Sequence, residues 1–159
     1  MTIICIKDRK LAWDSQVTST GGFKWGSIND KVVRLTSNKR SYYVGGCGSL
    51  QAIQLFIKRL KEMEADALEE WMIDPKHQTD RTTTLFMYDP KDEIIFEFQD
   101  KGAPVWLNMK KKSYAIGTGS EYAYGVMDKG GKAYEAVKMV IGRFDGCGLP
   151  IHRAEWRER

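Results

Sequence analysis

The hydrophobic pattern of the chain changes its period at residues 45–48 (GGCG), and this change constrains the fold more than any other feature. Before it come four strand-like runs rich in β-branched and aromatic residues: 2–7, 10–17, 31–36 and 40–46. After it, apolar residues recur at spacings of three and four, which predicts an amphipathic helix that Ser49 can cap. Strands followed by a helix that covers them predict an α+β fold with a mostly antiparallel sheet.

The sequence also predicts the loops and the later strands and helices. A tight turn at Asp8-Arg9 predicts a hairpin, and residues 18–29 are expected to form a loop. The first helix can run as far as Met72, because Pro75 then ends it. Beyond it we expect a second hairpin (82–88 and 93–99), a lead-in segment (104–108), a short strand (114–116) and two helices separated by Gly130-Gly131.

Length and composition exclude several classes of protein. With 159 residues the chain suits one domain over 1–159, and a net charge of +4 gives little reason to expect nucleic-acid binding. Three cysteines without a CxxC motif and only two histidines predict neither a metal site nor a cofactor, and they favour the reducing cytoplasm. No apolar run approaches the roughly 18 residues that a membrane span needs.

Thr2 is the first candidate for chemistry. Removal of Met1 would place the threonine hydroxyl next to its own free α-amino group, whose unperturbed pKa is about 7.7–8.0. That pKa suits a general base near neutral pH, so one residue could supply both the nucleophile and the base.

Four segments together resemble a known family. They are 11–18 (LAWDSQVT), 31–35 (KVVRL), 44–48 (VGGCG) and 117–128 (GTGSEYAYGVMD). In order and spacing they are similar to the proteasome β subunits and the bacterial HslV peptidase, which are N-terminal nucleophile hydrolases. The compact length looks closest to the short proteasome-like proteins of bacteria and phages.

The resemblance implies a role for each matching residue. Thr2 Oγ1 would attack the scissile carbonyl, and Lys31 would favour the deprotonated nucleophile. Asp14 would orient Lys31, and the Gly46 N–H group would stabilise the oxyanion.

The resemblance also implies supporting residues near the C-terminus, where the chain departs from the family pattern. Thr118 and Cys147 stand where the family has serine, and Phe144 stands where it has aspartate. Asp145 lies one position away. Either a local shift brings Asp145 into the site, or the supporting network is degraded.

For the whole protein, the resemblance implies a four-layer αββα sandwich, with two stacked sheets between helix layers. It further implies a ring-like homo-oligomer that hydrolyses peptides or unfolded proteins, with an ATP-dependent unfoldase as a possible partner.

Other interpretations stay open. The chain could keep the fold as a catalytically inactive scaffold or binding protein, which the departures at 144 and 147 favour. It could also bind nucleic acid through Lys110, Lys111 and Lys112 together with the basic C-terminal tail. Asp14 and Lys31 could form an ordinary surface ion pair, and the glycines at 45–48 could simply turn a strand into a helix.

Overall fold

The described residues form two compact units, and each unit has its own sheet. The computed structural model describes residues 2–18, 24–27, 31–37, 40–62, 83–98 and 104–157. The first unit comprises Met1–Asn29 with Met109–Arg159, and the second comprises Asp30–Asn108. The single domain expected over 1–159 stays a prediction.

The first unit contains a four-stranded antiparallel sheet. Its order is β10 (Ser113–Gly117), β1 (Ile3–Lys7), β2 (Lys10–Asp14) and β11 (Ile151–Glu155). The hairpin between β1 and β2 confirms the predicted turn, because Asp8 and Arg9 have φ values of 51° and 60°. Two consecutive left-handed residues match the twist of a tight hairpin. β11 was not predicted.

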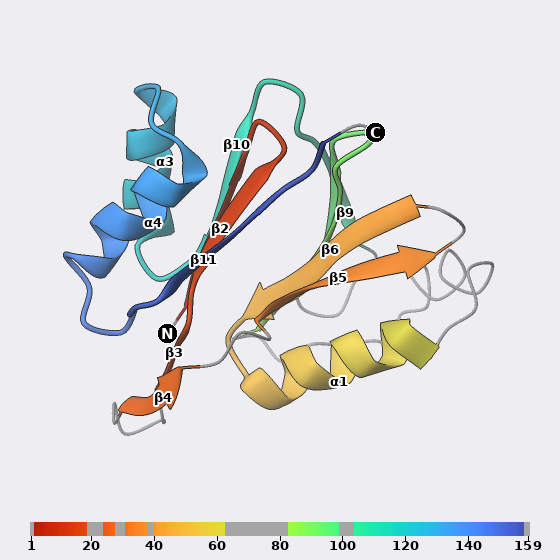
Figure 1. The fold of residues 1–159 in the computed structure, drawn as a ribbon, viewed down its shortest axis with the longest axis horizontal. Coiled ribbons are helices and arrows are strands. Elements are labelled where there is room, and N and C mark those ends of the chain that lie inside the picture. Colours follow the sequence, from red (N-terminus) through yellow and green to blue (C-terminus); the bar gives the residue numbers. More distant parts are fainter. Residues whose placement is uncertain are drawn as a thin grey trace. The chain divides into compact units, whose positions relative to one another are not determined.

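Two helices pack on this sheet (Figure 1): α3 (Ser120–Asp128) against β10, and α4 (Ala133–Ile141) against β1 and β2. Ile3 and Cys5 alternate along β1 and belong to the same buried cluster as the helices. The helices contribute mostly small side chains to this cluster, which lets their backbones approach the sheet: Ala123, Met127, Ala133, Ala136, Val137 and Val140. Both helices confirm the predicted ones.

The second unit is an antiparallel meander covered by one helix. Its strands follow chain order: β5 (Val32–Ser37), β6 (Arg40–Cys47), β7 (Thr84–Asp89), β8 (Ile94–Phe98) and β9 (Val105–Asn108). The amphipathic helix α1 (Leu50–Glu62) contacts β6 and buries Ile53, Phe56, Ile57 and Leu60. The Ala52 N–H group donates to Ser49 Oγ at 3.3 Å, which confirms the predicted cap. The predicted extension to Met72 lies outside the described residues.

A short hairpin follows β2 in the chain. β3 (Gln16–Thr18) pairs with β4 (Lys24–Ser27), with an irregularity between Val17 and Thr18. The loop expected over 18–29 is therefore wrong at β4, where the backbone is extended and paired.

The predicted four-layer αββα sandwich is wrong for the described part of the chain. Strands dominate it, with eleven strands against three helices. Each unit pairs one antiparallel sheet with the helices that contact it: α3 and α4 in the first unit, and α1 in the second. The sequence pattern indicated most of the strands and all three helices, with β4 and β11 as exceptions, but it carried no information on how sheets combine into layers. No helix among the described residues is long and apolar enough to cross a membrane.

Candidate functional site

Thr2 directly precedes β1 in the first unit. Only 7% of its surface is exposed. Its carbonyl oxygen accepts a hydrogen bond of 2.7 Å from the Thr118 N–H group. This bond continues the pairing of β1 with β10, in which Ile3 stands opposite Gly117. The N-terminal segment is therefore fixed against the turn that leads into α3.

Asp14 is the centre of the site in this unit. Its side chain is fully buried at the end of β2. Oδ1 accepts from the Ile3 N–H group at 3.0 Å, while Oδ2 accepts from the N–H groups of Gln16 at 3.1 Å and Gly148 at 3.2 Å. Hydrogen bonds to a charged acceptor are stronger than neutral ones, so this carboxylate joins three separate backbone segments. One of them is the residue directly after Thr2.

The loop 145–148 is held to β2 and β3 by further bonds. The Ser15 N–H group donates to the Gly148 carbonyl at 3.2 Å, and Gln16 Nε2 donates to the Asp145 carbonyl at 3.1 Å. A Cβ atom on Gly148 would lie 2.2 Å from Gln16 Oε1, so a larger residue here would displace the Gln16 side chain that bonds to Asp145. Asp145 thus contributes its backbone to the site while its side chain is exposed.

Cys147 is buried in the same loop, with 4% of its surface exposed, and it belongs to the same core cluster as Cys5 on β1. Burial raises the pKa of the Cys5 thiol far above its ordinary value, and the charge that Cys147 can carry raises it further. The Cys5 thiol is therefore protonated and packs as a small apolar group.

Two predicted site residues belong to the second unit. Lys31 is buried, with 3% of its surface exposed, and directly precedes β5. Gly46 lies in β6 where a Cβ atom would come within 2.5 Å of the Thr84 carbonyl oxygen. Close packing between β6 and β7 is therefore a sufficient reason for glycine at this position. Burial raises the pKa of the neighbouring Cys47 thiol, while hydrogen bonds from Thr84 and the charge of Lys31 lower it.

Within the first unit the structure brings together Thr2, Asp14, Thr118 and the loop that carries Asp145 and Cys147. Lys31 and Gly46 are described separately in the second unit, and the roles predicted for all these residues stay predictions. Sequence reasoning missed all three backbone partners of Asp14, which are Ile3, Gln16 and Gly148. The glycine directly after Cys147 was the one available signal for a close backbone approach.

Comparison with known proteins places the fold. No family model and no curated protein matches the chain. Among solved structures, BPH from Thiobacillus denitrificans in complex with epoxomicin is similar over 96% of each chain, with 18% identity and a TM-score of 0.64. The Anbu (Gly-1) mutant from Hyphomicrobium sp. strain MC1 is similar over 98% of this chain and 82% of its own, with 12% identity and a TM-score of 0.74.

The chain shares their fold. The helical assembly of Anbu from Pseudomonas aeruginosa agrees, with 12% identity, a TM-score of 0.71, and coverage of 98% of this chain and 81% of the other. The likeness to Anbu, an ancestral β-subunit, is one of fold. Identities this low carry no statement on activity.

These findings correct the family placement made from the motifs. The resemblance to proteasome β subunits and HslV is replaced by a structural likeness to BPH and Anbu, without a match to any family model. The physical reason is that short glycine motifs encode local backbone geometry. Gly119, for example, precedes α3 with φ of 72°, and a Cβ atom there would lie 2.8 Å from the Phe144 ring. Any chain with this turn needs glycine at that position, whatever its family.

Proposed function

We propose that the chain is a threonine-type peptidase in which Thr2 is the nucleophile once Met1 has been removed. The Thr2 hydroxyl proton passes to the α-amino group as Oγ1 attacks the scissile carbonyl. The tetrahedral intermediate collapses to an ester, and the leaving amine takes up the proton. Water then hydrolyses the ester, which regenerates the free hydroxyl.

The observation that carries the proposal is the fixation of the peptide group that joins Thr2 to Ile3. Its carbonyl accepts from Thr118, and the next N–H group, that of Ile3, donates to the buried carboxylate of Asp14. These bonds hold the peptide group directly after the Thr2 Cα atom, to which the side chain and the amine are attached. A nucleophile needs this fixation, because small displacements of reacting groups reduce the rate strongly.

The roles predicted for Lys31 and Gly46 remain part of the proposal. A positive charge on Lys31 would favour the deprotonated hydroxyl, and the Gly46 N–H group would donate to the oxyanion. Lys31 is 3% exposed, and a buried charge acts more strongly than one in water.

The structural neighbours support two further elements of the proposal. Because BPH has been solved with epoxomicin bound, we expect this compound to bind here as well. Because Anbu forms a helical assembly, we expect the chain to form a homo-oligomer. Its substrates would be peptides or unfolded proteins, with an ATP-dependent unfoldase as a possible partner.

Hydrolysis of a fluorogenic peptide series tests the activity. We expect Thr2→Ala to lower kcat/KM by at least about 10³-fold, because it removes the nucleophile itself. Thr2→Ser should keep part of the activity because it keeps the hydroxyl. Thr36→Ala, on an exposed position of β5, is the matched control and should behave as wild type. Equal rates for Thr2→Ala and wild type would refute the proposal.

A second candidate is a proteasome-like scaffold without catalysis. The exposed side chain of Asp145 favours it, because that carboxylate was the expected substitute for the aspartate that Phe144 replaces. In this case the chain would assemble as an oligomer in mass photometry while hydrolysing no peptide, and Thr2→Ala would change neither result.

A further inference from the structure

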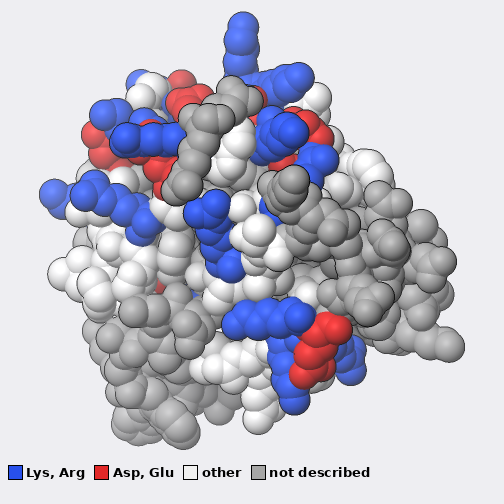
Figure 2. All heavy atoms as spheres, turned by 45° about the vertical axis from the view of Figure 1, so that its right-hand side comes forward, with Lys and Arg blue, Asp and Glu red and all other residues white. Residues whose placement is uncertain are grey.

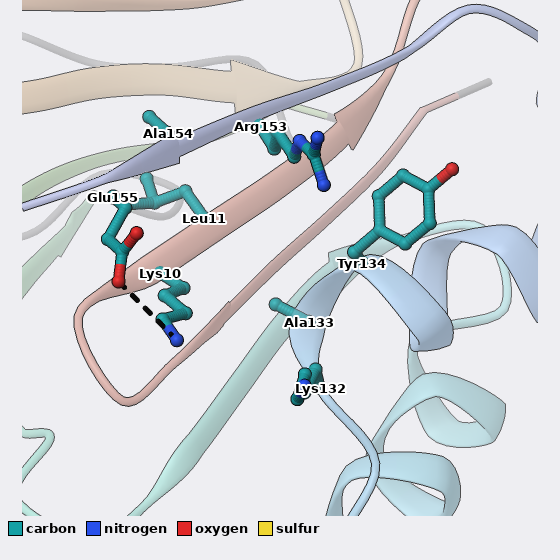
Figure 3. Close-up of a pocket in the computed structure, with 8 residues that line it drawn as sticks. All are labelled: Lys10, Leu11, Lys132, Ala133, Tyr134, Arg153, Ala154 and Glu155. Carbon is teal, nitrogen blue, oxygen red and sulfur yellow. Dashed lines mark ion pairs between the residues drawn. The ribbon is translucent and has the colours of Figure 1, made fainter.

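A pocket of about 530 Å³ lies in the first unit, away from the residues that surround Thr2. Its walls come from β2, β11 and the beginning of α4 (Figure 3). A volume between roughly 300 and 1,000 Å³ is typical of sites for small molecules. The lining residues are Lys10, Leu11, Lys132, Ala133, Tyr134, Arg153, Ala154 and Glu155.

The charges that line this pocket are unbalanced. Three cations, Lys10, Lys132 and Arg153, stand against one carboxylate, that of Glu155. Lys10 Nζ and Glu155 Oε1 form an ion pair at 3.4 Å. The remaining excess of two positive charges is carried by Lys132 and Arg153. On the face drawn in Figure 2, acidic and basic side chains lie next to each other at several places.

Lys132 and Arg153 belong to different elements. The Arg153 guanidinium of β11 lies over the Tyr134 ring, 5.5 Å from its centroid, which limits the orientations of both side chains. Lys132 stands directly before α4, and its backbone N–H group donates to Glu135 Oε2 at 2.8 Å. A planar guanidinium and an ammonium that line the same pocket suit a compact anion with several acceptor oxygens.

We propose that this pocket binds a phosphate group, either free or as the phosphomonoester of a small molecule. A phosphate group carries nearly two negative charges at neutral pH, which matches the excess of two positive charges. We expect its oxygens to accept from Arg153 and Lys132. This site does not depend on the activity proposed for Thr2.

Isothermal titration calorimetry of the full chain with sodium phosphate tests the proposal, at an ionic strength held constant with sodium chloride. We expect a saturable heat with one phosphate per chain. Arg153→Gln and Lys132→Gln should each weaken binding by about tenfold or more, because each removes a charge-assisted bond. Lys58→Gln, on the exposed face of α1, makes the same change in charge and should bind as wild type.

Two further titrations distinguish the sources of the phosphate group. If glycerol 3-phosphate or AMP binds tenfold more tightly than inorganic phosphate, the occupant is a phosphomonoester; equal affinities indicate free phosphate. The proposal is overturned if phosphate gives no saturable heat, or if both pocket variants bind as Lys58→Gln does. It is also overturned if a hexaglutamate peptide binds more tightly than every phosphate tested, since the surface would then recognise acidic protein segments.

Discussion

Replacement of Asp14 by asparagine should destabilise the protein by about 3–5 kcal/mol. The carboxylate accepts from three backbone N–H groups, those of Ile3, Gln16 and Gly148. The asparagine side chain can take two orientations. In the better one, its amide oxygen keeps the hydrogen bonds from the Gln16 and Gly148 N–H groups, while its NH₂ group faces the Ile3 N–H donor. An orphaned buried donor costs about 1–3 kcal/mol, and each of the two remaining bonds loses about 1 kcal/mol when its acceptor becomes neutral.

Urea unfolding followed by circular dichroism measures this loss as a lower midpoint at an unchanged m-value. Asp145→Asn makes the same chemical change in the loop that Asp14 anchors, but on an exposed side chain, and should alter the unfolding free energy by less than about 0.5 kcal/mol. A loss below about 1 kcal/mol for Asp14→Asn, or equal losses for the two variants, would refute the assignment of Asp14 as the junction of these segments.

Three further substitutions test the packing around the site by the same unfolding assay. Gly148→Ala should cost about 1 kcal/mol, because its Cβ would displace the Gln16 side chain and break its bond to the Asp145 carbonyl; a neutral effect would contradict the close approach. Gly119→Ala should cost about 2–4 kcal/mol, because alanine is strained at φ of 72° and its Cβ would also clash with the Phe144 ring. Gly142→Ala is the control without such a clash, and a smaller loss for Gly119→Ala than for this control would contradict the reasoning. Cys5→Ala should reduce alkaline destabilisation. Because folding raises the pKa of Cys5, its contribution to the free energy of unfolding is complete below the ordinary pKa of 9.0. Above that pH the contribution falls by up to about 1.4 kcal/mol per pH unit. If the free energy of unfolding falls equally with pH in wild type and Cys5→Ala, the pKa shift is contradicted.

The sequence predicted those elements whose hydrophobic pattern is local. The helix α1 follows from the repeat of Ile53, Phe56, Ile57 and Leu60, and the β1–β2 hairpin follows from two apolar runs around Asp8-Arg9. β11 escaped prediction because it is a half-exposed edge strand with a polar sequence. It is defined by its pairing with β2. In this pairing Ile151 stands opposite Asp14, although most of the sequence lies between the two residues.

The sequence predicted which residues belong to the candidate site, but it did not predict the hydrogen bonds between them. Thr2 and Asp14 were both singled out, but Asp14 was expected to orient Lys31. The structure adds three backbone donors, one of them 134 positions away at Gly148. A bond over that separation depends on where the loop 145–148 meets β2, and no local pattern encodes this position. The same holds for Asp145, which contributes its carbonyl rather than its carboxylate.

Intact-mass spectrometry before and after incubation with epoxomicin tests the central claim that Thr2 is an N-terminal nucleophile. The account predicts that the wild-type chain lacks Met1 and gains the mass of one epoxomicin, while Thr2→Ala also lacks Met1 but gains nothing. Retention of Met1 in every wild-type molecule, or equal gains in wild type and Thr2→Ala, would contradict it.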